Sequence, residues 1–241
     1  MSTTDWITER RSAMERLELL QGAVMAEVDG WQQPLHYGNL ENELKILREI
    51  VGIHDLSPRG AVRLVGDGAV SLATGLSSGQ KELAVGRVRE CRIATENRTA
   101  SLLELRLTKE EIVLLTAPGD GESVTEFFRR SPASCVHAVD ISSGLAGAGI
   151  NGPKAASLLS MITELDVSAE ALPDLHCVQS RFADVQGLLV RQDVGTAPAF
   201  QLYIAREYGE YVWEAITQAA RHLGGGPVGT EAIRGLLQDG C

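Results

Sequence analysis

The sequence has few aromatic residues, few cysteines and an excess of acidic over basic residues. Phe, Trp and Tyr make up 5% of the 241 residues, whereas Gly occurs 25 times and hydrophobic residues make up 44%. This composition is typical of a globular chain with many turns and argues against a disordered one. A chain of this length can bury a substantial core in one or two domains.

Basic residues are scarce and dispersed. Lys and Arg number 22 against 32 Asp and Glu, which gives a formal net charge of −10. Nucleic acids and anionic membranes need a concentrated basic surface, and the densest basic run is Glu9-Arg10-Arg11, so we expect neither partner. No apolar stretch approaches the ~18–20 residues of a membrane-spanning helix. The stretch Met1–Arg11 has no apolar signal core, and we expect a cytoplasmic protein.

The four cysteines are far apart and form no Cys-x-x-Cys pair. They are Cys91, Cys135, Cys177 and Cys241. We interpret them as reduced structural thiols. Because no two Cys or His residues show zinc-finger spacing, we expect no metal site.

The chain begins with a helical pattern and then changes to strands. Apolar residues recur at helical spacing over Asp5–Val28, which predicts an N-terminal helical extension of about residues 1–28. Gly30–Pro34 breaks this pattern. A second helix is predicted from the N-cap residue Asn39 up to Gly52.

Three strand-like runs separated by polar turns predict an antiparallel meander. They cover Val88–Ala94, Ser101–Leu107 and Ile112–Thr116. Further strands are predicted at 61–65, 136–141, 188–191 and 200–204, and further helices at 69–75, 123–130, 154–162, 208–223 and after 227. Helices packed on antiparallel strands indicate the α+β class. Without a long linker, residues 1–241 read as one module.

Common catalytic and nucleotide-binding motifs are missing. Gly66-Asp67-Gly68 follows a strand but lacks the complete Gly-x-Gly-x-x-Gly pattern, so a tight strand-to-helix turn explains it better. Neither Ser-Ser-Gly run forms the Gly-x-Ser-x-Gly of a nucleophile elbow.

Three residues are candidates for acid–base chemistry. His54 and Asp55 follow a helix stop at the start of a strand, where side chains can face a cleft. Glu104 interrupts an apolar strand. If Glu104 points inward, burial raises its pKa and makes it an acid–base candidate, whereas if it points outward it is an ordinary solvent-facing residue.

Several blocks resemble a known family. Gly30–Gly38 (GWQQPLHYG) is similar to the GW-x-x-P-x-x-Y opening of the aminomethyltransferases, the glycine-cleavage T-proteins. Gly52–Ser57 resembles the family's helix-ending Gly and Asp-x-Ser strand. Val65–Ala69, Ile150–Ala155 and Phe200–Leu202 resemble later blocks in the same order, and the similarity extends to about Arg234.

The resemblance implies a tetrahydrofolate-binding fold, with tetrahydrofolate as the expected cofactor, and chemistry on an aminomethyl or methyl group. The family's meander carboxylate falls near Ser101, where a shifted hairpin would let Glu104 stand in. The family's ring-orienting tyrosine falls near Glu90 or Arg89. The glutamate that reads the pterin edge is Gln201, and Arg234 remains from the closing Arg-Asp-x-x-Arg block. These departures make standard aminomethyl transfer doubtful.

Three functions follow from the resemblance. The first is a pocket derived from the folate site and turned to another small, biosynthetic molecule. The second is a tetrahydrofolate-dependent one-carbon transferase such as a demethylase. The third is a non-catalytic folate-binding subunit similar to the small subunit of heteromeric sarcosine oxidase. The family continues into a C-terminal barrel that this sequence does not contain, so we expect a homodimer or a partner subunit to cover the apolar surface.

Overall fold

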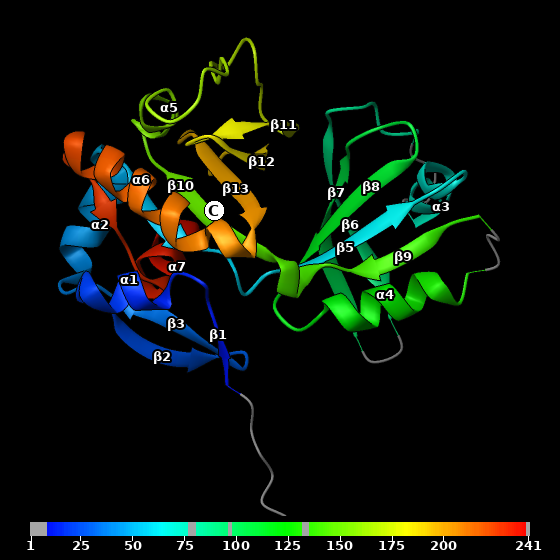
Figure 1. The fold of residues 1–241 in the computed structure, drawn as a ribbon, viewed down its shortest axis with the longest axis horizontal. Helices are drawn as coiled ribbons and strands as arrows, with labels where there is room; N and C mark the ends of the chain where they lie inside the picture. The colour runs from blue at the N-terminus through cyan, green and yellow to red at the C-terminus, as the bar shows by residue number, and fades with distance from the viewer. Residues whose placement is uncertain (1–8, 77–80, 96–97, 132–134, 240–241) are drawn as a thin grey trace, which may run out of the picture.

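The computed structural model describes residues 9–76, 81–95, 98–131 and 135–239. Within these ranges the strands form three sheets with helices packed against them (Figure 1). Most strand pairs are antiparallel, and the predicted α+β class with packed helices is confirmed.

The N-terminal sheet has the strand order β1-β3-β2. The elements around it are β1 (Arg10–Arg11), α1 (Glu15–Leu20), β2 (Val24–Val28), β3 (Trp31–His36), α2 (Leu40–Glu49) and α7 (Thr230–Asp239). The predicted N-cap is confirmed, because the Asn39 side-chain oxygen accepts a hydrogen bond from the Glu41 N–H at 2.8 Å. Helices α2 and α7 pack together through Leu47, Ala232 and Leu236.

The predicted helix over Asp5–Val28 is wrong in its described part, and residues 5–8 lie outside the described residues. Only α1 is helical, and Gly22 ends it with φ at +90°. Strands β2 and β3 form a hairpin around Asp29-Gly30, whose φ angles are +52° and +76°. An Asp-Gly pair between two strands is a strong hairpin signal, because both positions need positive φ.

The meander sheet has the order β6-β7-β8-β5-β9. Its elements are β5 (Gly60–Val65), α3 (Ala69–Leu76), β6 (Val88–Ala94), β7 (Thr99–Arg106), β8 (Glu111–Thr116), α4 (Gly121–Arg129) and β9 (His137–Asp140). The predicted antiparallel meander is confirmed in β6-β7-β8. Gly66-Asp67-Gly68 forms the predicted turn between β5 and α3. Helices α3 and α4 cover one face of this sheet with a buried apolar cluster that includes Leu64, Leu114 and Phe128.

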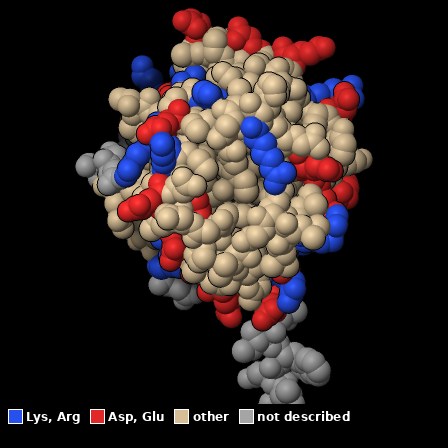
Figure 2. Space-filling model, turned by 90° about the vertical axis from the view of Figure 1, so that its left-hand side faces the viewer, with Lys and Arg blue, Asp and Glu red and all other residues tan. Residues whose placement is uncertain are grey.

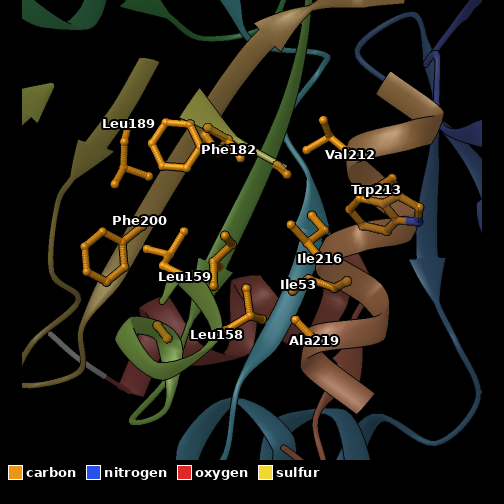
Figure 3. Close-up of a cluster of buried hydrophobic side chains, with 14 of the residues drawn as sticks. Ile53, Leu158, Leu159, Phe182, Leu189, Phe200, Val212, Trp213, Ile216 and Ala219 are labelled. Atoms are coloured by element: carbon orange, nitrogen blue, oxygen red, sulfur yellow. The ribbon is translucent and has the colours of Figure 1, made fainter. Parts of the chain in front are cut away.

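The central sheet has the order β11-β12-β13-β10-β4-β14. Its elements are β4 (Gly52–Asp55), β10 (Leu145–Asn151), α5 (Ala155–Leu159), β11 (His176–Phe182), β12 (Val185–Arg191), β13 (Ala199–Ala205), α6 (Gly209–His222) and β14 (Gly226–Pro227), with short 3-10 turns at Ser142–Gly144 and Arg206–Tyr208. Helices α5 and α6 cover one face, where Ile53, Phe200, Trp213 and Ile216 are buried (Figure 3).

The second face of the central sheet packs against the meander sheet. A shared apolar cluster joins Val88, Leu103 and Leu115 of the meander sheet to Val190 and Tyr203 of the central sheet. Because strand side chains alternate between faces, every second residue of β6, β7 and β13 points into this contact. Beyond the edge of the apolar cluster, polar residues of these strands point the same way. They lie between the two sheets, where they can form a site.

Candidate functional site

The chain crosses from the central sheet to the meander sheet in the turn between β4 and β5. Asp55 Oδ1 accepts a hydrogen bond from the Ser57 N–H at 2.7 Å, and the Arg59 N–H donates to the Leu56 carbonyl at 3.0 Å. Ser57 Oγ in turn accepts a hydrogen bond from the Gly147 N–H. The Asp-x-Ser block therefore fixes the turn that presents Arg59 between the two sheets.

One row of residues crosses the central sheet on the face toward the meander sheet. His54 of β4 and Gln201 of β13 both pair with Gly149 of β10. A Cβ built on Gly149 would lie 2.0 Å from His54 Cε1, so the imidazole occupies the space that glycine leaves. The row therefore needs glycine in its centre.

A series of hydrogen bonds, here called the amide chain, runs from Arg59 through Gln201 and Gln192 to Glu90. Arg59 Nη1 donates to Gln201 Oε1 at 2.9 Å. Gln201 Nε2 donates to Gln192 Oε1 at 2.9 Å, and Gln192 Nε2 donates to Glu90 Oε1 at 2.7 Å. The cationic end and the anionic end fix the orientation of both amides, because each amide must accept from one side and donate to the other.

The amide chain borders a hollow of about 510 Å³ between the sheets. Its lining residues are Arg59, Glu90, Cys91, Arg92, Ser101, Leu102, Leu103 and Gln192. This volume lies within the ~300–1,000 Å³ of small-molecule pockets, and an apolar wall with a few convergent polar groups is typical of them.

Burial and the charge of Arg59 together set the electrostatics beside the hollow. Burial, with a smaller contribution from the Arg59 guanidinium, lowers the pKa of His54 to about 4, so this imidazole is neutral at pH 7. Burial raises the pKa of Tyr203, an effect that Arg59 opposes. The Tyr203 hydroxyl donates to Gln201 Oε1 at 2.8 Å. Arg59 is therefore the dominant charge on this side of the hollow.

Three of the predicted cofactor-binding residues meet at this site. Glu90 and Ser101 line the hollow, and Gln201 lies in the amide chain beside it. Sequence reasoning missed Arg59 and Gln192. Arg59 follows the Asp-x-Ser block directly, a position that could have indicated it, whereas nothing local marks Gln192 at the end of β12.

The structure does not bring Glu104 to the hollow. Glu104 is fully buried, and Arg89 donates to its Oε2 from Nε at 3.1 Å and from Nη2 at 2.6 Å. It alternates along β7 with Ser101 and Leu103, so it points to the helix-covered face of the meander sheet. A shifted hairpin does not occur, and Glu104 cannot stand in for a carboxylate between the sheets.

His54 and Asp55 point to opposite faces of β4, so they do not form a catalytic pair. Asp55 lies in a second polar cluster, here called the acidic cluster, with Glu18 of α1 and Tyr37. Burial, with a smaller contribution from the neighbouring Asp55, raises the pKa of Glu18 to about 9. Burial also raises the pKa of Asp55 and that of Tyr37. Both Glu18 oxygens, Asp55 Oδ2 and the Tyr37 hydroxyl are buried without a hydrogen-bond partner in the described structure.

Arg234 lies away from the hollow. It is an exposed residue of α7, the helix that packs on α2, and it is not among the lining residues. The resemblance implied a binding role for Arg234, and its position in the structure does not support that role.

A larger hollow of about 930 Å³ lies near the β11–β12 turn and α6. Arg181 and Asp184 line it with side chains that are 69% and 90% exposed, so it is an open surface groove. We favour the smaller hollow as the site, because it has the ordered polar network.

Within the described ranges, no group of three or more His, Cys, Asp or Glu side chains is placed to hold a metal ion. The same residues contain no helix that is long and apolar enough to span a membrane. Cys91 and Cys177 are free thiols, while Cys241 lies outside the described residues. Burial raises the pKa of Cys91 and of Cys177 to about 12, which argues against reactive thiolates there.

Comparison with known proteins decides the family. The GCVT N-terminal domain family matches residues 14–239. The chain belongs to this family. It is 28% identical over 218 residues to the aminomethyltransferase of Chloroherpeton thalassium, which covers 88% of this chain and 59% of that protein. For the aminomethyltransferase of Symbiobacterium thermophilum the identity is 27%, covering 92% and 62% of the two chains. The chain thus spans about 60% of the length of these relatives.

Two solved structures share the fold of this GCVT-family chain. Aminomethyltransferase T of the glycine cleavage system from Bartonella henselae superposes with a TM-score of 0.82 at 18% identity, covering 95% of this chain and 62% of the other. A chain of heterotetrameric sarcosine oxidase from Corynebacterium sp. U-96 superposes with a TM-score of 0.61 at 15% identity, covering 91% of this chain and 98% of the other. The predicted resemblance to the aminomethyltransferases is confirmed.

Proposed function

We propose that this GCVT-family chain binds a small polar molecule in the hollow between its two larger sheets, and that this molecule is not tetrahydrofolate. The observation that carries the proposal is the set of hydrogen bonds made by the Gln201 side chain. Its oxygen already accepts hydrogen bonds from Arg59 and Tyr203, and its nitrogen donates to Gln192. The site is therefore arranged for a ligand different from the one implied by the resemblance.

The residues present do not fit a pterin. The resemblance implies a glutamate that reads the pterin edge, where one carboxylate can accept two N–H bonds together. Gln201 stands at that position with a single acceptor oxygen, which two donors already share, and its remaining N–H would face the N–H groups of a pterin.

The position of the buried Glu104 carboxylate on β7 also argues against one-carbon transfer. Glu104 is ion-paired with Arg89 on the far face of the meander sheet. Loss of a positioned general acid or base removes roughly 10²–10⁴-fold of rate. A tetrahydrofolate-dependent transferase would therefore need another acid or base. Of the predicted candidates, His54, which is neutral at pH 7, lies in the row with Gln201.

A folate-binding subunit without catalysis is the second candidate. It is favoured by the superposition on a chain of similar length from a heterotetrameric sarcosine oxidase. An assembly with a second chain, either a copy or a partner subunit, goes with this candidate. Exposed apolar residues of α1 and α6, including Leu20 and Tyr211, support association. A monomer by light scattering would argue against it.

Calorimetric titration with tetrahydrofolate and 5-formyl-tetrahydrofolate separates these candidates. We expect no saturable binding of either compound below ~100 μM and no rise in Tm, because a ligand stabilises the fold only when it binds the native state. The variant Gln201→Glu is the matched test of the cause, since restoring the carboxylate gives a pterin an acceptor. Saturable binding of either folate to the unaltered chain would overturn the proposal in favour of the binding subunit.

A further inference from the structure

Arg59 differs from Arg89 and Arg191, two other arginines with little solvent exposure, in the charge of its hydrogen-bond partners. Arg89 is 12% exposed and pairs with Glu104, and Arg191 is 9% exposed and pairs with Asp193. Arg59, also partly buried, donates to Gln201 Oε1 and to the Thr116 carbonyl. These acceptors are neutral, and no carboxylate of the described residues forms an ion pair with Arg59. A half-buried cation without an anionic partner is costly unless a ligand supplies the anion.

A second guanidinium faces the same hollow. Arg92 is an exposed residue of β6, lies directly opposite Ser101 on β7, and lines the hollow. No ion pair or hydrogen bond of its side chain occurs among the described residues. Both arginines therefore line one cavity.

The acidic residue of the lining restricts the kind of anion. Glu90 lies two residues before Arg92 on the same strand face, and its Oε1 accepts the hydrogen bond that ends the amide chain. A dianionic phosphate would be repelled by Glu90 and by the net charge of −10. A carboxylate carries a single charge and can accept two parallel N–H bonds from a guanidinium.

We infer that Arg59 is the anion-recognition residue of the hollow and that the ligand carries a carboxylate, with Arg92 as the second cation. This inference rests on the proposed function. Arg59 acts directly on the ligand and also holds Gln201 through Nη1. The amide chain therefore reports on occupancy of the site.

Three probes of nearly equal shape test the inference: benzoate, the neutral benzamide and the dianionic phenylphosphonate. Each is titrated into the ¹⁵N-labelled chain while the side-chain amide signals of Gln192 and Gln201 are followed, with assignments from Gln192→Met and Gln201→Met spectra. Hydrogen bonds to a charged partner favour benzoate over benzamide by about 10-fold or more. In Arg59→Met the preference for benzoate over benzamide is lost.

Arg63→Met is the matched control, because Arg63 is an exposed arginine of β5 that pairs with Glu111 outside the hollow. It should keep the benzoate preference. Because the comparison of benzoate with benzamide is made on the unaltered chain, it does not depend on the variants folding.

Each outcome decides something. Equal binding of benzoate and benzamide, or tighter binding of phenylphosphonate, contradicts the carboxylate assignment and leaves the small-molecule pocket intact. If none of the three probes moves the Gln192 and Gln201 signals, the pocket itself is contradicted, and with it the proposed function.

Discussion

The amide chain and the acidic cluster both place polar side chains inside the fold, but they differ in how those groups are paired. In the amide chain, Gln201 uses both its oxygen and its nitrogen, and the charges at the two ends are opposite. In the acidic cluster, the Glu18 carboxyl makes no hydrogen bond and lies near a second acid, Asp55.

This difference distinguishes the amide chain, which a ligand can reach, from the acidic cluster, whose buried polar groups lack hydrogen-bond partners. The amide chain opens onto a hollow, so a ligand can reach its polar groups. Glu18 is 0% exposed and lies near the buried Asp55, so a ligand has no access to its carboxyl. On the face turned toward the viewer in Figure 2, basic and acidic residues are interspersed over the middle, and acidic residues gather along the upper edge.

The largest predicted effect is on the acidic cluster. Because the pKa of Glu18 is raised from 4.5 to about 9, the folded chain retains a proton that the unfolded chain releases above about pH 4.5. The free energy of unfolding therefore falls as pH rises between about 4.5 and 9. Glu18→Gln removes this cost and should raise stability by about 2–5 kcal/mol near pH 8, with little change near pH 4.

Urea denaturation of the unaltered chain and of Glu18→Gln at several pH values measures this effect. The exposed Glu214→Gln is the matched control and should change stability by less than about 0.5 kcal/mol. If the free energy of unfolding depended on pH equally in the unaltered chain and in Glu18→Gln, the account of Glu18 would be contradicted.

A smaller effect tests the row beside the amide chain. In Gly149→Ala the new Cβ would lie 2.0 Å from His54 Cε1, so the variant should lose about 2–3 kcal/mol of stability. In Gly75→Ala, where nothing lies within 4 Å of the new Cβ, a helical position should gain up to about 1 kcal/mol. Adding His54→Ala to Gly149→Ala should recover much of the loss, and a failure to recover would place the imidazole elsewhere.

The smallest effect concerns the amide chain itself. Gln201→Leu leaves Gln192 Oε1 and an Arg59 N–H without their partners, and should cost about 1–2 kcal/mol. Glu90→Gln, at the exposed end, should change stability by less than about 0.5 kcal/mol. If both variants were neutral, the amide chain would not be an ordered structure in solution.

Helices and strands were predicted correctly where the periodicity of apolar side chains and the capping residues indicate the same element. The meander and the Asn39 cap are local patterns, and both are confirmed. The predicted N-terminal helix was wrong because the helical spacing of apolar residues was given more weight than Asp29-Gly30. This Asp-Gly pair is a signal for a β-hairpin and was present in the sequence. Strand β11 was missed because its burial depends on pairing with β12, which one-dimensional periodicity does not report.

The site could be predicted only in part. Glu90, Ser101 and Gln201 were identified by resemblance, and they do lie around one hollow. Glu104 was misplaced because alternation along β7 leaves its face undecided until the register with β6 is known. The roles of Arg59 and Gln192 depend on contacts across two sheets, which residue spacing cannot give.

The side-chain amide signals of Gln192 and Gln201 in a ¹H–¹⁵N spectrum test the central claim most directly. The account predicts that both signals move saturably when benzoate is added, and that 5-formyl-tetrahydrofolate at ~100 μM leaves them unchanged. Saturable movement with the folate and none with benzoate would contradict it.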